Sequence, residues 1–291
     1  MELNKKQIEF LNDSTKDPWT GVSIGVWTIN EKTGLVDIKG NFDCGRRGES
    51  SFKGIKFGVV TGNFDCGSCW FYGTLEGAPQ EVGGNFDCSN SVIKSLEGAP
   101  RRVGGNFDCS GNNFKNLKGA PKEVGGNFIC TRGYSRGKLT SLKGAPKEVG
   151  GDFNCSYNSL KSLVGAPQKV GGDFNCESNF IKSLVGAPKE VGGDFNCSHN
   201  SLKSLVGAPQ EVGGNFVSRN NEIAKWLSDR IYEIMKNSVN LRIGLALIKK
   251  EILDAKQKEI DSINSKYDTF LIEDEDLVKG VSMLNNFGHF D

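Results

Sequence analysis

The stretch GGDFNCSYNSLKSLVGAPQKV, residues 150–170, decides the fold of this chain, because it recurs along most of the sequence. Its phenylalanine returns at steps of 22, 22, 21, 21, 25, 21, 21 and 21 residues. Self-similarity at such a period is the signature of stacked repeats, each of which needs neighbours to bury its apolar face. Repeats one to nine are defined here by Phe42, Phe64, Phe86, Phe107, Phe128, Phe153, Phe174, Phe195 and Phe216.

Each repeat contains the same buried pattern. Phe-x-Cys predicts a short strand whose alternate side chains point inward, and only repeat nine lacks the cysteine, with Ser218 in its place. An asparagine follows, suited to cap buried backbone groups because its side chain both donates and accepts. Two leucines return to the core, and the Gly-Ala-Pro segment reverses the chain. The asparagine site is held by Asn112, Asn158, Asn179, Asn200 and Asn221.

This spacing resembles the leucine-rich repeat family, with phenylalanine and cysteine in the two strand positions. More narrowly, the pattern GAPxxVGGxFxCSxNxLxSL resembles repeats in uncharacterised proteins of tailed bacteriophages. The resemblance covers residues 19–221. It implies a leucine-rich repeat solenoid with a parallel β-sheet on the concave side and a mostly irregular convex side. It also implies interaction rather than a particular reaction, and it brings no functional residues.

We expect three parts in the chain. Residues 1–39 form an N-terminal segment and β cap, with a hairpin within 19–39, and residues 40–221 hold nine leucine-rich repeats of about 21–25 residues. In residues 222–291 the apolar spacing becomes helical, which predicts an α-helical C-terminal cap. The alternative for this last part is an effector or dimerisation arm.

Composition excludes several classes of protein. The chain carries 36 basic and 35 acidic residues, a net charge of +1, which argues against a general nucleic-acid binder. No apolar run approaches the ~18 residues of a membrane span, and the first residues lack a signal peptide's apolar core. Nine cysteines without an export signal fit a reducing compartment. We therefore expect a cytoplasmic protein, in a bacterial host if it is encoded by a phage.

The strand residues on either side of each phenylalanine are expected to face solvent. In seven of the nine repeats one of the two is aspartate and the other asparagine, and neither position holds a lysine or arginine. At a strand spacing of ~4.8 Å, neighbouring carboxylates repel by roughly 1 kcal/mol in water. This predicts an acidic track that receives a basic surface; the alternative is a solvated polar ladder copied by duplication. The aspartates are Asp43, Asp65, Asp87, Asp108, Asp152, Asp173 and Asp194.

Repeat five departs from the regular spacing and residue pattern of the others. Four extra residues lie between Cys130 and Leu139, and Ile129 replaces the aspartate of the track. Insertions in solenoids fall on loops and often mark the contact side. Because arginine and tyrosine are enriched at interfaces, Arg132, Tyr134 and Arg136 are candidate contact residues. A tolerated surface insertion is the alternative.

A column of lysines suggests a different kind of partner, a nucleic acid. Past the turn of each repeat stand Lys94, Lys115, Lys161, Lys182 and Lys203. A phosphate backbone could lie along them, but no stacking aromatic residues accompany them. Nucleic-acid binding is therefore kept as a third hypothesis, after protein binding and a structural role.

Catalytic chemistry is hard to build from these residues. The chain has two histidines and no hydrolase, metalloprotease or phosphate-binding motif. The pair Cys66 and Cys69 supplies two zinc ligands where a structural site needs four, and in repeat register Cys69 occupies the asparagine site. We expect no enzyme activity, no cofactor and no metal.

The sequence therefore predicts a non-catalytic interaction module that binds and covers a basic surface on a host protein, a defence or regulatory component. A structural, virion-associated protein that self-associates through its C-terminal helices is the alternative.

Overall fold

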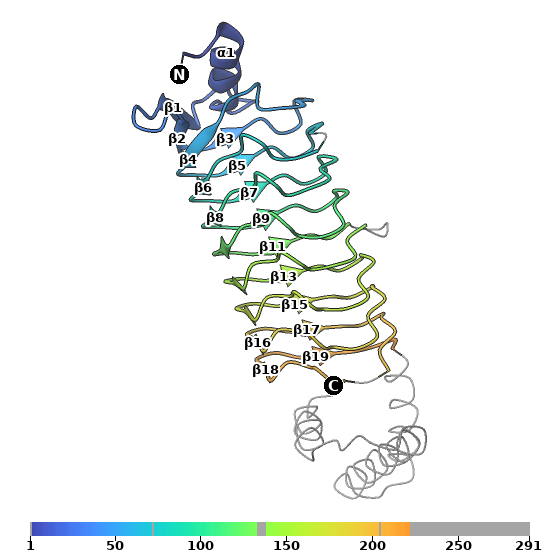
Figure 1. Cartoon of the computed structure of the whole chain (residues 1–291). Coiled ribbons are helices and arrows are strands. Elements are labelled where there is room, and N and C mark those ends of the chain that lie inside the picture. The colour runs from blue at the N-terminus through green and yellow to red at the C-terminus, as the bar shows by residue number, and fades with distance from the viewer. Residues whose placement is uncertain (1, 72, 133–137, 204, 222–291) are drawn as a thin grey trace, which may run out of the picture.

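The computed structural model describes residues 2–71, 73–132, 138–203 and 205–221, which form one elongated parallel β-solenoid (Figure 1). Each repeat contributes one short strand to each of two sheets that run the length of the stack. The solenoid architecture expected from the repeat is thus confirmed. The helices expected in 222–291 lie outside the described residues, as do Tyr134 and Arg136.

One sheet is built from the phenylalanine positions and is called the phenylalanine sheet. Its nine strands pair in parallel and in register, so that Phe153 stands opposite Phe128 on one side and Phe174 on the other. The strands are β3 (Phe42–Asp43), β5 (Phe64–Asp65), β7 (Phe86–Asp87), β9 (Phe107–Asp108), β11 (Phe128–Ile129), β13 (Phe153–Asn154), β15 (Phe174–Asn175), β17 (Phe195–Asn196) and β19 (Phe216–Val217).

The other sheet, called the valine sheet, corrects one expectation. A single sheet with an irregular opposite side was predicted, but the residues before the seven Gly-Gly pairs join β1, β2 and β4 in a second, ten-stranded sheet. A buried valine alternates there with an exposed charged residue, the pattern of a half-buried strand. The strands are β1 (Gly25–Ile29), β2 (Val36–Gly40), β4 (Phe57–Val60), β6 (Glu81–Val82), β8 (Arg102–Val103), β10 (Glu123–Val124), β12 (Glu148–Val149), β14 (Lys169–Val170), β16 (Glu190–Val191) and β18 (Glu211–Val212).

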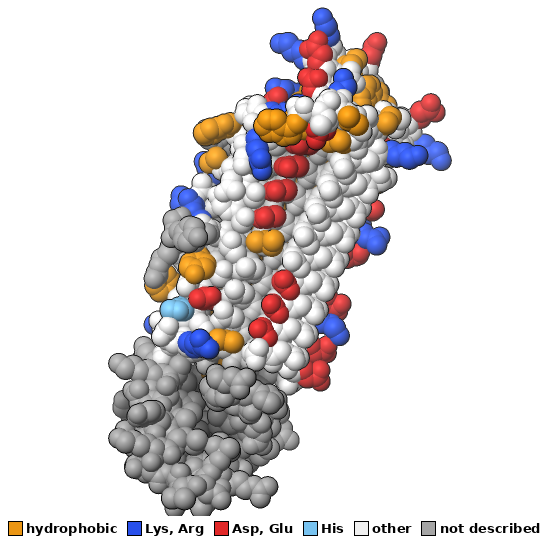
Figure 2. Space-filling view, turned by 180° about the vertical axis from the view of Figure 1, so that it is seen from behind, with side chains coloured by type: hydrophobic (Ala, Val, Ile, Leu, Met, Phe, Trp, Pro, Cys, Tyr) orange, Lys and Arg blue, Asp and Glu red, His pale blue; other side chains and the backbone are white. Residues whose placement is uncertain are grey.

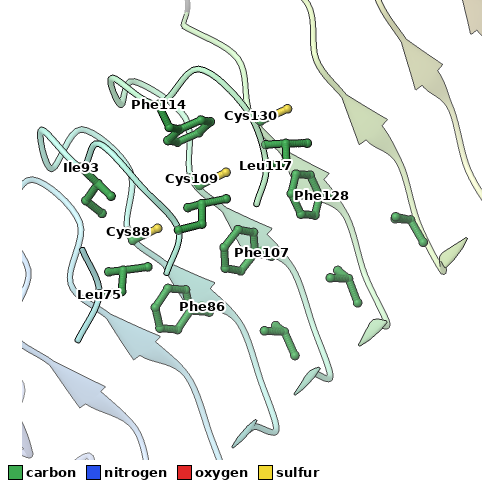
Figure 3. Packing of buried hydrophobic residues seen from close by; sticks show 14 of the residues in the cluster. Leu75, Phe86, Cys88, Ile93, Phe107, Cys109, Phe114, Leu117, Phe128 and Cys130 are labelled. Carbon is green, nitrogen blue, oxygen red and sulfur yellow. The ribbon is translucent and has the colours of Figure 1, made fainter. Parts of the chain in front are cut away.

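The core lies between the two sheets and the remaining side, which we call the loop side. Figure 3 shows phenylalanine, cysteine and leucine or isoleucine of successive repeats in parallel rows. The phenylalanine rings stack along the solenoid, with centroids 5.5 Å apart between Phe153 and Phe174 and 5.3 Å between Phe174 and Phe195. Each core side chain therefore packs against the same residue type in the neighbouring repeats, and every added repeat buries its side chains through the same set of contacts.

The asparagine site works as predicted. Asn179 is buried, and its Nδ2 donates to the carbonyls of Cys155, Cys176 and Glu177 at 3.1–3.2 Å. Its Oδ1 accepts from the backbone N–H of Leu160 in the preceding repeat, at 2.9 Å.

Other residue types fill this site in early repeats. Cys69 Sγ lies 3.0 Å from the carbonyl of Cys44, as its register predicted, and Ser91 Oγ lies 3.0 Å from that of Cys66.

The Gly-Gly pairs make the bend between the sheets. A Cβ on Gly171 would overlap the carbonyl oxygen of Gly150, and one on Gly172 would overlap the side chain of Asp152. Glycine is therefore required for close approach between successive repeats, and the second glycine leaves the space that the preceding side chain fills.

The N-terminal end is capped. The predicted hairpin is present as the antiparallel pair β1–β2. The sequence reading missed helix α1 (Lys5–Ser14), which starts at the Asn4/Gln7 capping box. Phe10 and Leu11 of this helix are buried, and the Phe10 ring lies 5.6 Å from that of Phe42. The helix thus covers the first turn of the core.

Candidate functional site

The predicted acidic side chains lie together on the outer face of the phenylalanine sheet. Asp43, Asp65, Asp87 and Asp108 are direct neighbours on β3, β5, β7 and β9. Ile129 occupies the next position on β11, opposite Asp108. Figure 2 shows the acidic side chains as a row along this face, interrupted by a hydrophobic one. We call the column after the phenylalanines the inner column.

Beyond Ile129 the acids change column. Asp152, Asp173 and Asp194 stand before their phenylalanines, at the bend, in what we call the bend column; Asn41, Asn63, Asn85, Asn106, Asn127 and Asn215 occupy it in the other repeats. The acidic row therefore has two parts, repeats one to four in the inner column and repeats six to eight in the bend column, separated by repeat five, which has no acid in either column.

Every member of the bend column from repeat one to repeat eight has a structural task. Its Oδ1 accepts a hydrogen bond from the backbone N–H of the bend residue in the next repeat. Asn63 accepts from Asn85 at 2.8 Å, and Asp152 accepts from Asp173 at the same distance. Asparagine and aspartate perform this task alike. The sequence reading had placed these side chains freely in solvent, because a contact between repeats cannot be read from one repeat.

The inner column has a different task, also shared by both residue types. Each aspartate or asparagine of the column accepts from the N–H two residues later and closes a turn after the strand, while Ile129 and Val217 lack an acceptor. Asp108 Oδ1 accepts from Ser110 N at 2.9 Å and from Ser110 Oγ at 2.6 Å. Asn154 does the same with Ser156, at 3.1 Å and 2.7 Å. An uncharged asparagine therefore makes the same two bonds as an aspartate.

The charge has an electrostatic cost. Burial raises the pKa of the Asp65 carboxyl above its ordinary value, and the carboxylates of Asp87 and Asp43 raise it further. Burial likewise raises the pKa of Asp108, the hydrogen bonds from Ser110 offset part of this rise, and the carboxylate of Asp87 adds to it. These directions mean that the ionised form is disfavoured in the folded chain. Asparagine would avoid this cost at the same positions.

A third column keeps the face flat. The residues after the cysteine position are small in most repeats, and only Glu177 and Arg219 are large; they are Gly45, Gly67, Ser89, Ser110, Thr131, Ser156, Glu177, Ser198 and Arg219. No long side chain from this column therefore screens the aspartates in repeats one to four. A partner surface can approach the carboxylates closely there.

Repeat five departs from the others where the sequence predicted it. Arg132 is half-buried, and its Nη1 donates to Asn113 Oδ1 in repeat four at 2.6 Å. Its guanidinium is thus held against the neighbouring repeat. Tyr134 and Arg136, the other two predicted contact residues, lie outside the described residues.

The remaining faces carry most of the positive charge. Lys94, Lys115, Lys161, Lys182 and Lys203 are exposed on the loop side. On the valine sheet, the charged residues of strands β6 to β18 are five glutamates with Arg102 and Lys169 among them, and Lys169 Nζ lies 2.6 Å from Glu190 while Arg102 Nε lies 3.5 Å from Glu123. The negative row on the phenylalanine sheet is therefore set against a basic loop side.

The cysteine column belongs to the core. All nine cysteines are buried and free. Burial raises the pKa of eight of the thiols, that of Cys197 to about 12, whereas hydrogen bonding, with Cys44 first, lowers the pKa of the Cys69 thiol. Buried thiols of this kind are unreactive. Within the described ranges, no group of three or more His, Cys, Asp and Glu side chains is arranged to hold a metal ion.

Comparisons with protein families, with curated proteins and with solved structures find no match to this chain. Among the described residues, no helix is long and apolar enough to cross a membrane.

Proposed function

We propose that this solenoid is a non-catalytic binding module of the leucine-rich repeat type, which covers a basic surface of a protein partner with its phenylalanine sheet. One observation carries the proposal. Asparagine performs both structural tasks of the acidic positions in other repeats of the same chain, as Asn63 does at the bend and Asn154 in the inner column. The carboxylate charge is therefore surplus to the fold, and a binding role explains why it is present in seven of nine repeats.

The mechanism is occlusion by a rigid surface. Nine strands at ~4.8 Å give a face of roughly 40 Å along the stack. Rows of like charge on such a face attract a basic partner over a distance set by ionic strength and fix its orientation. The flat third column lets the partner reach the inner column. The loop of repeat five, with Arg132, Tyr134 and Arg136, supplies further contacts at the step in the row.

The setting of the proposal comes from the resemblance to tailed-bacteriophage proteins. It favours a partner in the bacterial host cytoplasm, a defence or regulatory component whose basic site is covered. Residues 222–291 contain the proposed helical cap, because Val212 and Phe216 at the end of the stack are only partly buried, unlike Val191 and Phe195 one repeat earlier.

The proposal is tested with a charge-neutral variant, Asp43→Asn, Asp65→Asn, Asp87→Asn and Asp108→Asn. Full-length wild-type and variant chains are immobilised and exposed to nuclease-treated bacterial lysate at low and moderate salt. The retained protein is purified, and its affinity for both chains is measured. We expect a salt-sensitive partner whose affinity falls at least tenfold in the variant, because four carboxylates facing the basic surface are lost.

A second variant removes the same number of charges from the other sheet: Glu123→Gln, Glu148→Gln, Glu190→Gln and Glu211→Gln. It should bind like the wild type. Equal affinity of the partner for all three chains would refute the acidic face as the binding site. Recovery of the bait alone, as an oligomer of defined mass, would favour the structural role, and steeply salt-dependent retention of plain DNA or RNA would favour nucleic acid.

A further inference from the structure

A row of exposed valines runs along the loop side of the last complete repeats. Val164, Val185 and Val206 are 62%, 52% and 56% exposed, each directly before the glycine of the Gly-Ala-Pro segment. Earlier repeats have Glu76, Glu97, Lys118 and Lys143 at this position. Charged residues are thus compatible with the fold here, so three adjacent apolar side chains in water call for another explanation.

The row continues into a groove between repeats five and six, with a volume of about 700 Å³. Ala145, Pro146, Val164 and Ala166 contribute apolar surface to it. Lys143 and Lys147 also line it. The groove therefore combines an apolar floor with positive charge.

Lysines flank the valine row on both sides in sequence. Lys161, Lys182 and Lys203 stand three residues before the valines, and Lys189 stands four residues after Val185. Thr140 lines the groove from the position that Lys161 holds one repeat later, which places the lysine column beside the valines. In the described part of the chain, no ion pair involves Lys161, Lys182 or Lys189. The patch fits a ligand that is apolar and acidic together.

The chain itself contains a segment of this chemistry. Residues 268–278 read DTFLIEDEDLV, with five acidic residues, five apolar residues and no basic one. We propose that this segment binds along the loop side of repeats five to eight, with Phe270, Leu271 and Ile272 on the valine row and the acidic run 273–276 facing the lysines.

Chain length and covalent linkage support this occupant. Forty-six residues, 222–267, separate the segment from Asn221. Even as an α-helix, at about 1.5 Å per residue, these residues would span about 69 Å, far more than the few strand spacings between the end of the stack and Val164. Since the segment and the patch share a chain, binding is intramolecular and has a high effective concentration. The inference concerns a different face from the proposed partner surface and does not depend on it.

The test is zero-length cross-linking of the full chain, in which a carbodiimide joins a lysine amine to a carboxylate with formal loss of water. Unlabelled and ¹⁵N-labelled chains are mixed in equal amounts, and cross-linked peptides are identified by mass spectrometry. We expect isotopically unmixed links between Glu273, Asp274, Glu275 or Asp276 and the lysines Lys161, Lys182, Lys189 or Lys203.

Two variants make the result specific. Val164→Glu, Val185→Glu and Val206→Glu copy the glutamates that repeats two and three tolerate, and should lower the yield of these links at least fivefold. Leu271→Asp with Ile272→Asp should do the same without touching the solenoid. Val22→Glu with Val26→Glu, at exposed valines elsewhere, should leave the yield unchanged.

Links from residues 273–276 to other lysines only, mixed-isotope links only, or equal yields in all four chains would overturn the proposal. Amide hydrogen exchange at residues 162–166 gives a second readout that does not require a reactive pair. We expect faster exchange there in the Leu271→Asp, Ile272→Asp variant than in the wild type, and equal rates would also count against the proposal.

Discussion

At the scale of single residues, the solenoid depends on amide side chains that satisfy backbone groups of two repeats at once. Asn179 donates to three carbonyls and accepts from Leu160 N–H, all in or beside the buried core. An aliphatic side chain could fill the space but could make none of these bonds. The site therefore selects for a side chain that both donates and accepts.

We expect Asn179→Ala to lower the free energy of unfolding by about 3 kcal/mol, because buried backbone groups lose their partners and each costs roughly 1–3 kcal/mol. Urea denaturation followed by circular dichroism measures the change. The exposed Gln168→Ala should shift the free energy by no more than about 0.5 kcal/mol. A loss below 1 kcal/mol for Asn179→Ala would contradict the capping role.

Asp108 and Asn154 offer a comparison at one position of the repeat. Both bind the N–H and hydroxyl of a serine two residues later, but the pKa of Asp108 is raised by burial and by Asp87. A carboxyl whose pKa is higher in the folded than in the unfolded chain binds its proton more readily when folded. The free energy of unfolding therefore falls as pH rises from the ordinary pKa of 3.8 through the raised value.

We expect Asp108→Asn to stabilise the solenoid at pH 7, because it removes the disfavoured charge and keeps both hydrogen bonds. At pH 3, where the aspartate is largely protonated, variant and wild type should have nearly equal stability. Urea denaturation at the two pH values measures this difference. A variant less stable than the wild type at pH 7 would show that the fold uses the carboxylate.

At the scale of strands and turns, the sequence predicted what one repeat can reveal. The period, the inward phenylalanine and cysteine, the asparagine site and the N-terminal hairpin were all readable, because each depends on residue types at fixed spacing. The second sheet was missed, since Glu190–Val191 is followed by two glycines and shows no second inward residue, whereas Phe-x-Cys shows two. Helix α1 was also missed, although Asn4 and Gln7 carry a capping-box pattern.

The acidic positions show the limit of prediction from the sequence of one repeat. Their side chains were correctly placed on one face, but the bond from Asp173 N–H to Asp152 crosses between repeats. Only the stacked structure shows that the side chain has a backbone partner 21 residues away. The contact also separates two properties of these side chains: the oxygen accepts a backbone hydrogen bond, and asparagine supplies the same oxygen without the charge.

At the scale of the whole molecule, the described chain is a rod with a different chemistry on each side. The phenylalanine sheet carries the acidic row, the valine sheet carries paired charges, and the loop side is basic with exposed valines towards its C-terminal end. A protein with such faces can engage an external partner on one side and its own C-terminal segment on another. The two proposals therefore concern different faces, and each can be tested without the other.

The central claim is that the carboxylate charges on the phenylalanine sheet serve binding and not folding. It is tested most directly by the free energy of unfolding of the Asp43→Asn, Asp65→Asn, Asp87→Asn, Asp108→Asn variant at pH 7. We predict that this variant is at least as stable as the wild type, because asparagine makes the same hydrogen bonds without repulsion between neighbouring repeats. A variant that is clearly less stable would mean that the aspartates belong to the fold, and the claim would fail.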